Sequence, residues 1–73
     1  MAIVGPDGKP TEAGSKILLA VRYGLSTLEE ISNSTDIPLF IVKTGLRELA
    51  QAGLVQQAAG RYELAPRGIE LLR

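Results

Sequence analysis

The sequence contains no cysteine, no histidine and no tryptophan, and its only aromatic residues are two tyrosines and one phenylalanine. Without cysteine the chain can have no disulfide, no thiolate nucleophile and no cysteine-based metal site. Without histidine it lacks the commonest metal ligand and the commonest general base. Because aromatic residues are so few, the core must be aliphatic. Because cysteine and histidine are absent, we expect a protein that is not an enzyme and that has no metal site and no cofactor.

The remaining polar residues do not suggest a catalytic site. Glu29 and Glu30 are neighbours and point about 100° apart on a helix, so they make a poor acid–base pair and are better suited to capping that helix. The serines have no histidine to activate them. The pair Gly5-x-x-Gly8 lacks the lysine and the strand–loop–helix context of a phosphate-binding loop.

Long hydrophobic runs and an excess of one charge are also missing. The longest apolar run is the five residues 17–21, far shorter than the roughly 20 residues of a membrane-spanning helix. The N-terminus lacks the basic region and apolar run of a signal peptide. Eight basic and eight acidic residues give a net charge of zero. We expect a single soluble, cytoplasmic domain over residues 1–73 with no membrane partner.

Helix signals and turn signals alternate along the chain. In the N-terminal arm, residues 1–10, residues 2–4 either form a short edge strand or fray, and Pro6-Asp7-Gly8 predicts a turn. An apolar stripe predicts a first helix between Thr11, which serves as N-cap, and Gly24, which follows its end.

Two further helices follow in close succession. The second begins with a capping box formed by Thr27 and Glu30, and the polar cluster 32–36 ends it after about seven residues. Pro38 occupies the first turn of the third helix, which ends at Gly53. The inward positions of this third helix are Val42, Leu46 and Leu49.

The last third of the chain predicts a hairpin and a short helix. Two short runs within residues 54–64 flank the three-residue loop 58–60, in which Gly60 should adopt a positive φ. Pro66 then opens a helix that runs to Arg73. We expect Ile69 and Leu72 to be the inward residues of this helix.

One weak internal similarity is present. Residues 10–14 before Ile17-Leu18 resemble residues 65–68 before Leu71-Leu72. A chain of this length is too short for a solenoid, so we interpret the similarity as two helices that begin alike.

The order of these elements resembles a known family. The matching motifs are Thr27-Leu-Glu-Glu-Ile31, Ile37-Pro-x-x-x-Val42, Leu46-x-x-Leu49, Gly53-Leu-Val55 and Tyr62-x-Leu64-x-x-x-Gly68-x-x-Leu71-Leu72. Over residues 11–73 the chain resembles the winged helix-turn-helix domains of small bacterial and archaeal transcription regulators. The resemblance implies an α+β, mostly α fold with a three-helix core, a helix-turn-helix at 27–52, a β-hairpin wing at 54–64 and a short C-terminal helix.

The resemblance also implies a function, sequence-specific binding of double-stranded DNA in transcription regulation. The residues of the third helix that it places against DNA are Leu39, Phe40, Lys43, Thr44 and Arg47. Lys43 and Arg47 suit phosphates or guanine edges, and Thr44 suits either a base or a phosphate. Leu39 and Phe40 depart from the usual polar residues; they could meet thymine methyls, or Leu39 could turn inward. In the wing, Arg61 either contacts DNA or is an ordinary turn charge.

The charge distribution favours DNA only modestly. Residues 1–36 carry a net charge of −2 and residues 37–73, which hold the third helix and the hairpin, carry +2. With so few cations a single copy should bind duplex loosely at physiological salt. We therefore expect a homodimer, formed through the first and last helices, or a larger parent protein.

A second function from a different class stays open. Winged helices also serve as protein-interaction modules, and the apolar run Leu39-Phe40-Ile41 could be such a surface. A fragment of an enzyme is a third and remote alternative.

Overall fold

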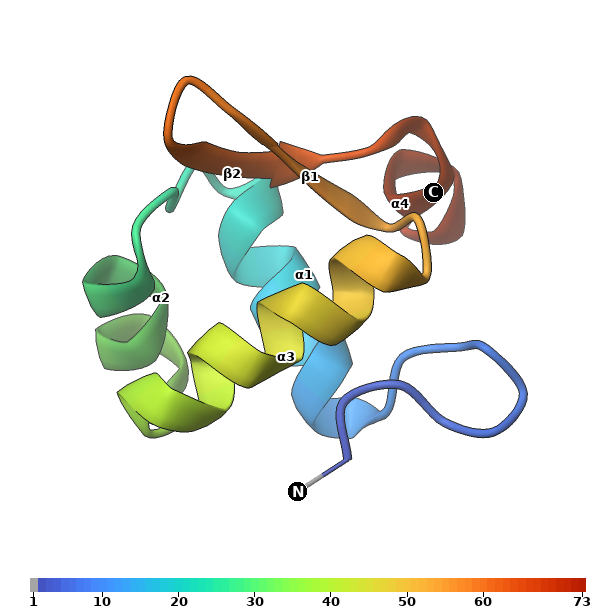
Figure 1. Ribbon diagram of the computed structural model, residues 1–73, viewed down its shortest axis with the longest axis horizontal. Coiled ribbons are helices and arrows are strands. Elements are labelled where there is room, and N and C mark those ends of the chain that lie inside the picture. Colours follow the sequence, from blue (N-terminus) through green and yellow to red (C-terminus); the bar gives the residue numbers. More distant parts are fainter. Residues whose placement is uncertain (1) are drawn as a thin grey trace.

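The computed structural model describes residues 2–73 and is an α+β, mostly helical domain, as the sequence predicted. Its elements are α1 (Glu12–Arg22), α2 (Leu28–Thr35), α3 (Leu39–Gln51), β1 (Val55–Ala58), β2 (Arg61–Leu64) and α4 (Pro66–Leu71). Figure 1 shows α3 lying across α1, with the hairpin of β1 and β2 above both and α4 beside the hairpin.

The N-terminal arm is anchored to the body of the protein. The Ile3 side chain is buried, and the Ile3 carbonyl accepts a hydrogen bond of 2.9 Å from the Thr11 N–H. Val4 and Pro10 form a single antiparallel bridge, and the Gly5 N–H donates to the Lys9 carbonyl. Of the two alternatives for residues 2–4, an edge strand reduced to one bridge describes the structure better than fraying does.

The predicted caps of α1 and α2 are confirmed. Thr11 Oγ1 accepts from the Gly14 N–H, and α1 ends just before Gly24. At α2, Thr27 Oγ1 accepts from the Glu30 N–H while the Glu30 carboxylate accepts from the Thr27 N–H. The polar cluster at 32–36 stays helical for longer than its composition suggests, because α2 continues to Thr35.

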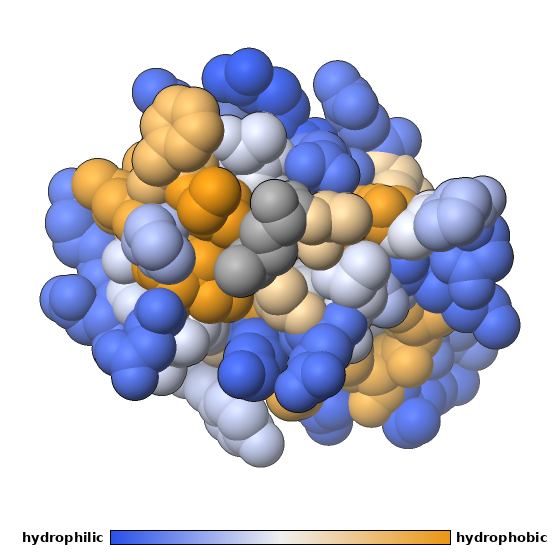
Figure 2. Space-filling view, turned by 90° about the horizontal axis from the view of Figure 1, so that it is seen from below, coloured by the Kyte–Doolittle hydropathy of each residue, from blue (hydrophilic) through white to orange (hydrophobic). Residues whose placement is uncertain are grey.

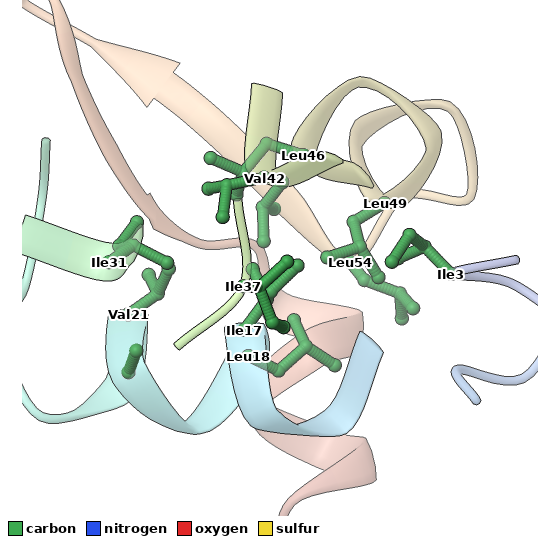
Figure 3. Packing of buried hydrophobic residues seen from close by; sticks show 12 residues of the cluster. Ile3, Ile17, Leu18, Val21, Ile31, Ile37, Val42, Leu46, Leu49 and Leu54 are labelled. Atoms are coloured by element: carbon green, nitrogen blue, oxygen red, sulfur yellow. The ribbon is translucent and has the colours of Figure 1, made fainter. Parts of the chain in front are cut away.

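The helix α3 supplies the centre of the core. Val42, Leu46 and Leu49 are fully buried, as their spacing predicted. The prediction placed Pro38 in the first turn of α3. In the structure Pro38 is instead the N-cap, one residue before that turn. Figure 3 shows the α3 side chains meeting buried residues of the other helices, the arm and the segment before β1. Burial of each such aliphatic side chain is worth about 1.5–3 kcal/mol.

The hairpin differs from the prediction at its tip. The pair Ala58↔Arg61 belongs to the ladder, so the loop has two residues, Ala59 and Gly60, and the predicted three-residue loop is wrong. Their φ angles of +53° and +77° are both positive, as a two-residue turn with the twist of a hairpin requires. The positive φ predicted for Gly60 is confirmed.

The helix α4 is shorter than predicted, and of its two predicted inward residues only Leu72 packs on the core. Gly68 is buried because its Cα lies against the Leu54 carbonyl, and Leu72 packs partly on the core. Ile69 follows Gly68 and is 52% exposed, so its predicted inward position is wrong. The contact of α4 with the body is therefore made through the backbone of Gly68 and the side chain of Leu72, which follows α4.

Candidate nucleic-acid interface

A groove of about 250 Å³ separates α3 from the hairpin. Its lining residues are Lys43, Leu46, Arg47, Ala50, Gln56, Gln57 and Tyr62. Lys43 and Arg47 are one helical turn apart, so both side chains border the groove from α3. The hairpin lies opposite because the segment after α3 turns back over the core through the buried Leu54 and Val55. The groove thus combines two cations with amide and phenol groups.

The two cations of the groove are available to a ligand. The ion pair found within residues 2–73 joins Arg73 to Glu70 in α4, at 3.5 Å between Nη1 and Oε2, and it involves neither Lys43 nor Arg47. Both lysine and arginine side chains are exposed. A cation that forms no ion pair with a carboxylate is free to pair with an incoming anion.

On the hairpin side, the groove is lined by the uncharged groups Gln56, Gln57 and Tyr62, and the first of these is bound to a carboxylate. Gln56 and Glu63 are cross-strand partners, and Gln56 Nε2 donates to Glu63 Oε1 at 2.7 Å. Gln57 stands opposite Tyr62 in the strand register. The sequence indicated hydrogen-bonding capacity at Gln56 and Gln57 but missed Tyr62. A two-residue loop would have paired Gln57 with Tyr62, and this register could have identified Tyr62 as a groove residue.

Thr44 lies on the outer face of α3, but its hydroxyl is already engaged. Thr44 Oγ1 donates to the Phe40 carbonyl at 3.0 Å, within its own helix. A threonine hydroxyl has one hydrogen, so while this bond is in place it can only accept a hydrogen bond from a ligand. A phosphate oxygen offers no hydrogen, which makes Thr44 unsuited to phosphate contact in this conformation.

The first turn of α3 is apolar and open to solvent. Leu39 is 44% exposed and Phe40 is 75% exposed, while Ile41 is half-buried against the core. The alternative in which Leu39 turns inward is therefore wrong. Figure 2 shows apolar side chains gathered on this side of the molecule, towards the end where α2 and the start of α3 lie.

Arg61 lies apart from the residues of α3. Its Nε donates to Ser26 Oγ at 3.1 Å, and the Ser26 carbonyl accepts from the Tyr62 N–H, which ties β2 to the connection between α1 and α2. Backbone hydrogen bonds from Ser26 and Thr27 lower the pKa of Glu30, and the charge of Arg61 lowers it a little further. The Arg61 side chain is thus held towards that connection.

The predicted site residues consequently fall into three places. Lys43 and Arg47 share the groove with the hairpin, Leu39 and Phe40 form the exposed first turn with Thr44 one turn later, and Arg61 is bound elsewhere. The spacing of the α3 residues on one helical face predicted their common exposure. The position of Arg61 depends on a contact 35 residues away in sequence, which no local pattern encodes.

Other features of the described chain do not suggest a different site. Two further hollows border α1 and the end of α2 and share Lys16 and Thr35. Among residues 2–73, no three His, Cys, Asp or Glu side chains are grouped closely enough to hold a metal ion. Within the same residues, every helix is too short or too polar to span a membrane.

Comparison of the chain with known protein families, with characterised proteins and with solved structures finds no match.

Proposed function

We propose that this protein binds double-stranded DNA as a winged helix-turn-helix domain and acts in transcription regulation. In this proposal α2 and α3 form the helix-turn-helix, α3 is the reading helix, and the hairpin is the wing. The protein is then a binding domain of the cytoplasm and not an enzyme. The order helix, short helix, amphipathic helix, hairpin supports this assignment.

One observation carries the proposal: Lys43 and Arg47 are exposed, take no part in an ion pair, and border a groove between α3 and the hairpin. A phosphate backbone that follows this groove would meet two cations from the helix and amide donors from β1. Phosphate contacts of this kind supply most of the affinity of DNA-binding domains and fix their orientation.

The dimensions of α3 suit the major groove of DNA. Its 13 residues give a length of about 20 Å. With side chains, a helix is roughly 10–12 Å across, close to the width of the major groove. Leu39 to Arg47 cover the N-terminal two turns, which is the part that helix-turn-helix proteins direct at bases.

A single copy should bind weakly, since it offers few phosphate contacts. We therefore propose that two copies act together on paired half-sites, with α1 and α4 at the contact because both leave α3 free. Light scattering should then give a mass above that of the 7.8 kDa chain at high micromolar concentration. A monomer mass at that concentration would exclude the homodimer.

The test of DNA binding is a titration of a fluorescent random-sequence duplex at two salt concentrations. Because about two phosphates are neutralised per copy, the logarithm of the affinity should fall with the logarithm of the salt concentration with a slope of roughly −2. The absence of binding at low salt would refute the proposal.

The exposed first turn of α3 supports a second function, a protein-interaction module. Phe40 is 75% exposed and adjoins Leu39, and exposed aromatic side chains are typical anchors of protein interfaces. In that case Phe40→Ala should cost about 2 kcal/mol or more in binding to the protein partner, and Arg47→Ala should change mainly the association rate.

A further inference from the structure

The outer face of α3 changes its chemistry along its length. The first turn exposes Leu39 and Phe40, which carry no polar atoms, and the cations Lys43 and Arg47 begin one turn later and border the hairpin groove. If the cations follow a phosphate backbone, the apolar turn lies against the base edges beyond it. The side chains of this turn therefore bring no hydrogen-bond donor to the base edges.

Thr44, one helical turn after Phe40, accepts hydrogen bonds from a ligand and does not donate them. Its hydroxyl hydrogen is committed to the Phe40 carbonyl. Guanine presents two acceptors in the major groove, and covering them with apolar atoms leaves them without partners. Adenine presents an amino group that can donate to Thr44 Oγ1, and the paired thymine presents a methyl group.

We infer that the first turn of α3 selects 5-methylpyrimidines, thymine above all, by contact of Leu39 and Phe40 with the methyl group in the major groove. This inference rests on the proposed DNA binding and adds a base preference to it. Thr44 strengthens the preference by accepting from the adenine of the same or a neighbouring pair.

The test compares duplex polymers that differ by one methyl group per pyrimidine. Alternating dA·dT and dA·dU duplexes carry the same charge, so their phosphate contacts and their salt dependence are matched. The parent protein should bind dA·dT about fourfold more tightly, the effect of burying one methyl-sized group. Duplexes of dG with 5-methyl-dC and with dC should differ in the same direction.

Variants assign the effect to the residues. In Phe40→Ala the ratio between the affinities for dA·dT and dA·dU should fall towards one, because the side chain that contacts the methyl group is gone. Tyr23→Ala removes an aromatic side chain that is 80% exposed at the end of α1, and it should leave the ratio unchanged. Arg47→Ala should weaken binding of both duplexes equally.

The failures of the two proposals are distinguishable. Equal, salt-dependent binding of dA·dT and dA·dU by the parent would overturn the methyl readout and leave DNA binding in place. A ratio that survives Phe40→Ala and Leu39→Ala would overturn the assignment to this turn. No binding of any of the duplexes would overturn DNA binding itself.

Discussion

Two regions of the molecule are built alike, residues 3–22 and residues 54–71. In each, two short extended segments pair and lead into a helix: Val4 bridges Pro10 before α1, and β1 pairs with β2 before α4. In each, the N–H of the helix N-cap donates back to the first extended segment. The Thr11 N–H reaches the Ile3 carbonyl at 2.9 Å, and the Ala65 N–H reaches the Leu54 carbonyl at 3.0 Å.

The likeness extends to one glycine in each region. Gly14 and Gly68 are the third residues of α1 and α4, and the Cβ of any other residue there would overlap the Ile3 and Leu54 carbonyl groups respectively. In each region, the glycine backbone thus lies against the same carbonyl group that accepts a hydrogen bond from the N-cap N–H. Figure 3 shows the Ile3 and Leu54 side chains directed into the core, which fixes both carbonyls in place.

The two regions differ in what covers their helices. Ile17 and Leu18 of α1 are fully buried, because α1 packs against α2, α3 and β2. The corresponding Leu71 is 42% exposed and Leu72 is half-buried, because α4 is short and lies at the edge. The same local arrangement therefore holds a buried helix at α1 and a peripheral helix at α4. Disrupting it should lower the free energy of unfolding more at α1 than at α4.

The largest effect is expected for Gly14→Ala. The added methyl group must displace the Ile3 carbonyl, and the buried arm with it. The free energy of unfolding should therefore fall by about 2–3 kcal/mol. Glycine to alanine in a free helix would be stabilising by about 1 kcal/mol, so the sign alone is informative. Urea unfolding measures the change, with exposed Lys16→Ala as the control. Stabilisation by Gly14→Ala would contradict the close contact between Gly14 and the Ile3 carbonyl.

A smaller loss is expected for Gly68→Ala. The same overlap arises with the Leu54 carbonyl, but α4 can move outwards, so the cost should be about 1–2 kcal/mol. The same denaturation experiment decides it. A loss larger than that of Gly14→Ala would show that α4 is not peripheral.

The caps of the two helices differ, and Thr11→Ala measures that difference. Thr11 Oγ1 accepts from the Gly14 N–H and donates to the Ala2 carbonyl of the arm at 2.8 Å, whereas Ala65 has no side-chain cap. Loss of the cap should reduce stability by about 1 kcal/mol. Thermal unfolding followed by circular dichroism should show the lower midpoint, and an unchanged midpoint would mean that the arm alone holds the start of α1.

The smallest effect is a gain, expected for Ala59→Asn. Ala59 has a φ of +53° at the hairpin tip, and asparagine followed by Gly60 is the favoured pair for such a turn. We expect stabilisation of about 0.5–1 kcal/mol. Ala58→Asn is the matched control, because Ala58 lies in the ladder and should gain nothing. Equal effects of the two variants would contradict the two-residue turn.

Local sequence patterns predicted much of this fold. They failed where contacts between residues far apart in sequence determine the structure. The capping box at Thr27 and the apolar spacing of α3 depend on neighbours within one or two turns, so both could be predicted. The inward side of α4 is set by the approach of Gly68 to the Leu54 carbonyl, and the sequence therefore misassigned Ile69. The similarity between residues 10–14 and 65–68 was visible, but the shared carbonyl contacts behind it were not.

The same division applies to the candidate site. The exposure of Lys43 and Arg47 follows from helical spacing, and their groove follows from the hairpin that comes next in the chain. The bond from Arg61 to Ser26 could not be predicted, since it joins segments far apart in sequence. The commitment of the Thr44 hydroxyl to Phe40 is a rotamer choice that residue type alone does not determine.

The most direct test of the account is the affinity of Lys43→Ala and Arg47→Ala for duplex DNA, measured by fluorescence anisotropy over a range of salt. Each variant should bind more weakly, by about 1–3 kcal/mol where the residue reads a base, and with a salt slope smaller by about one where it contacts phosphate. Lys9→Ala removes an exposed cation from the N-terminal arm and should bind as the parent does. If Lys43→Ala and Arg47→Ala also bind as well as the parent, α3 is not the DNA-binding surface.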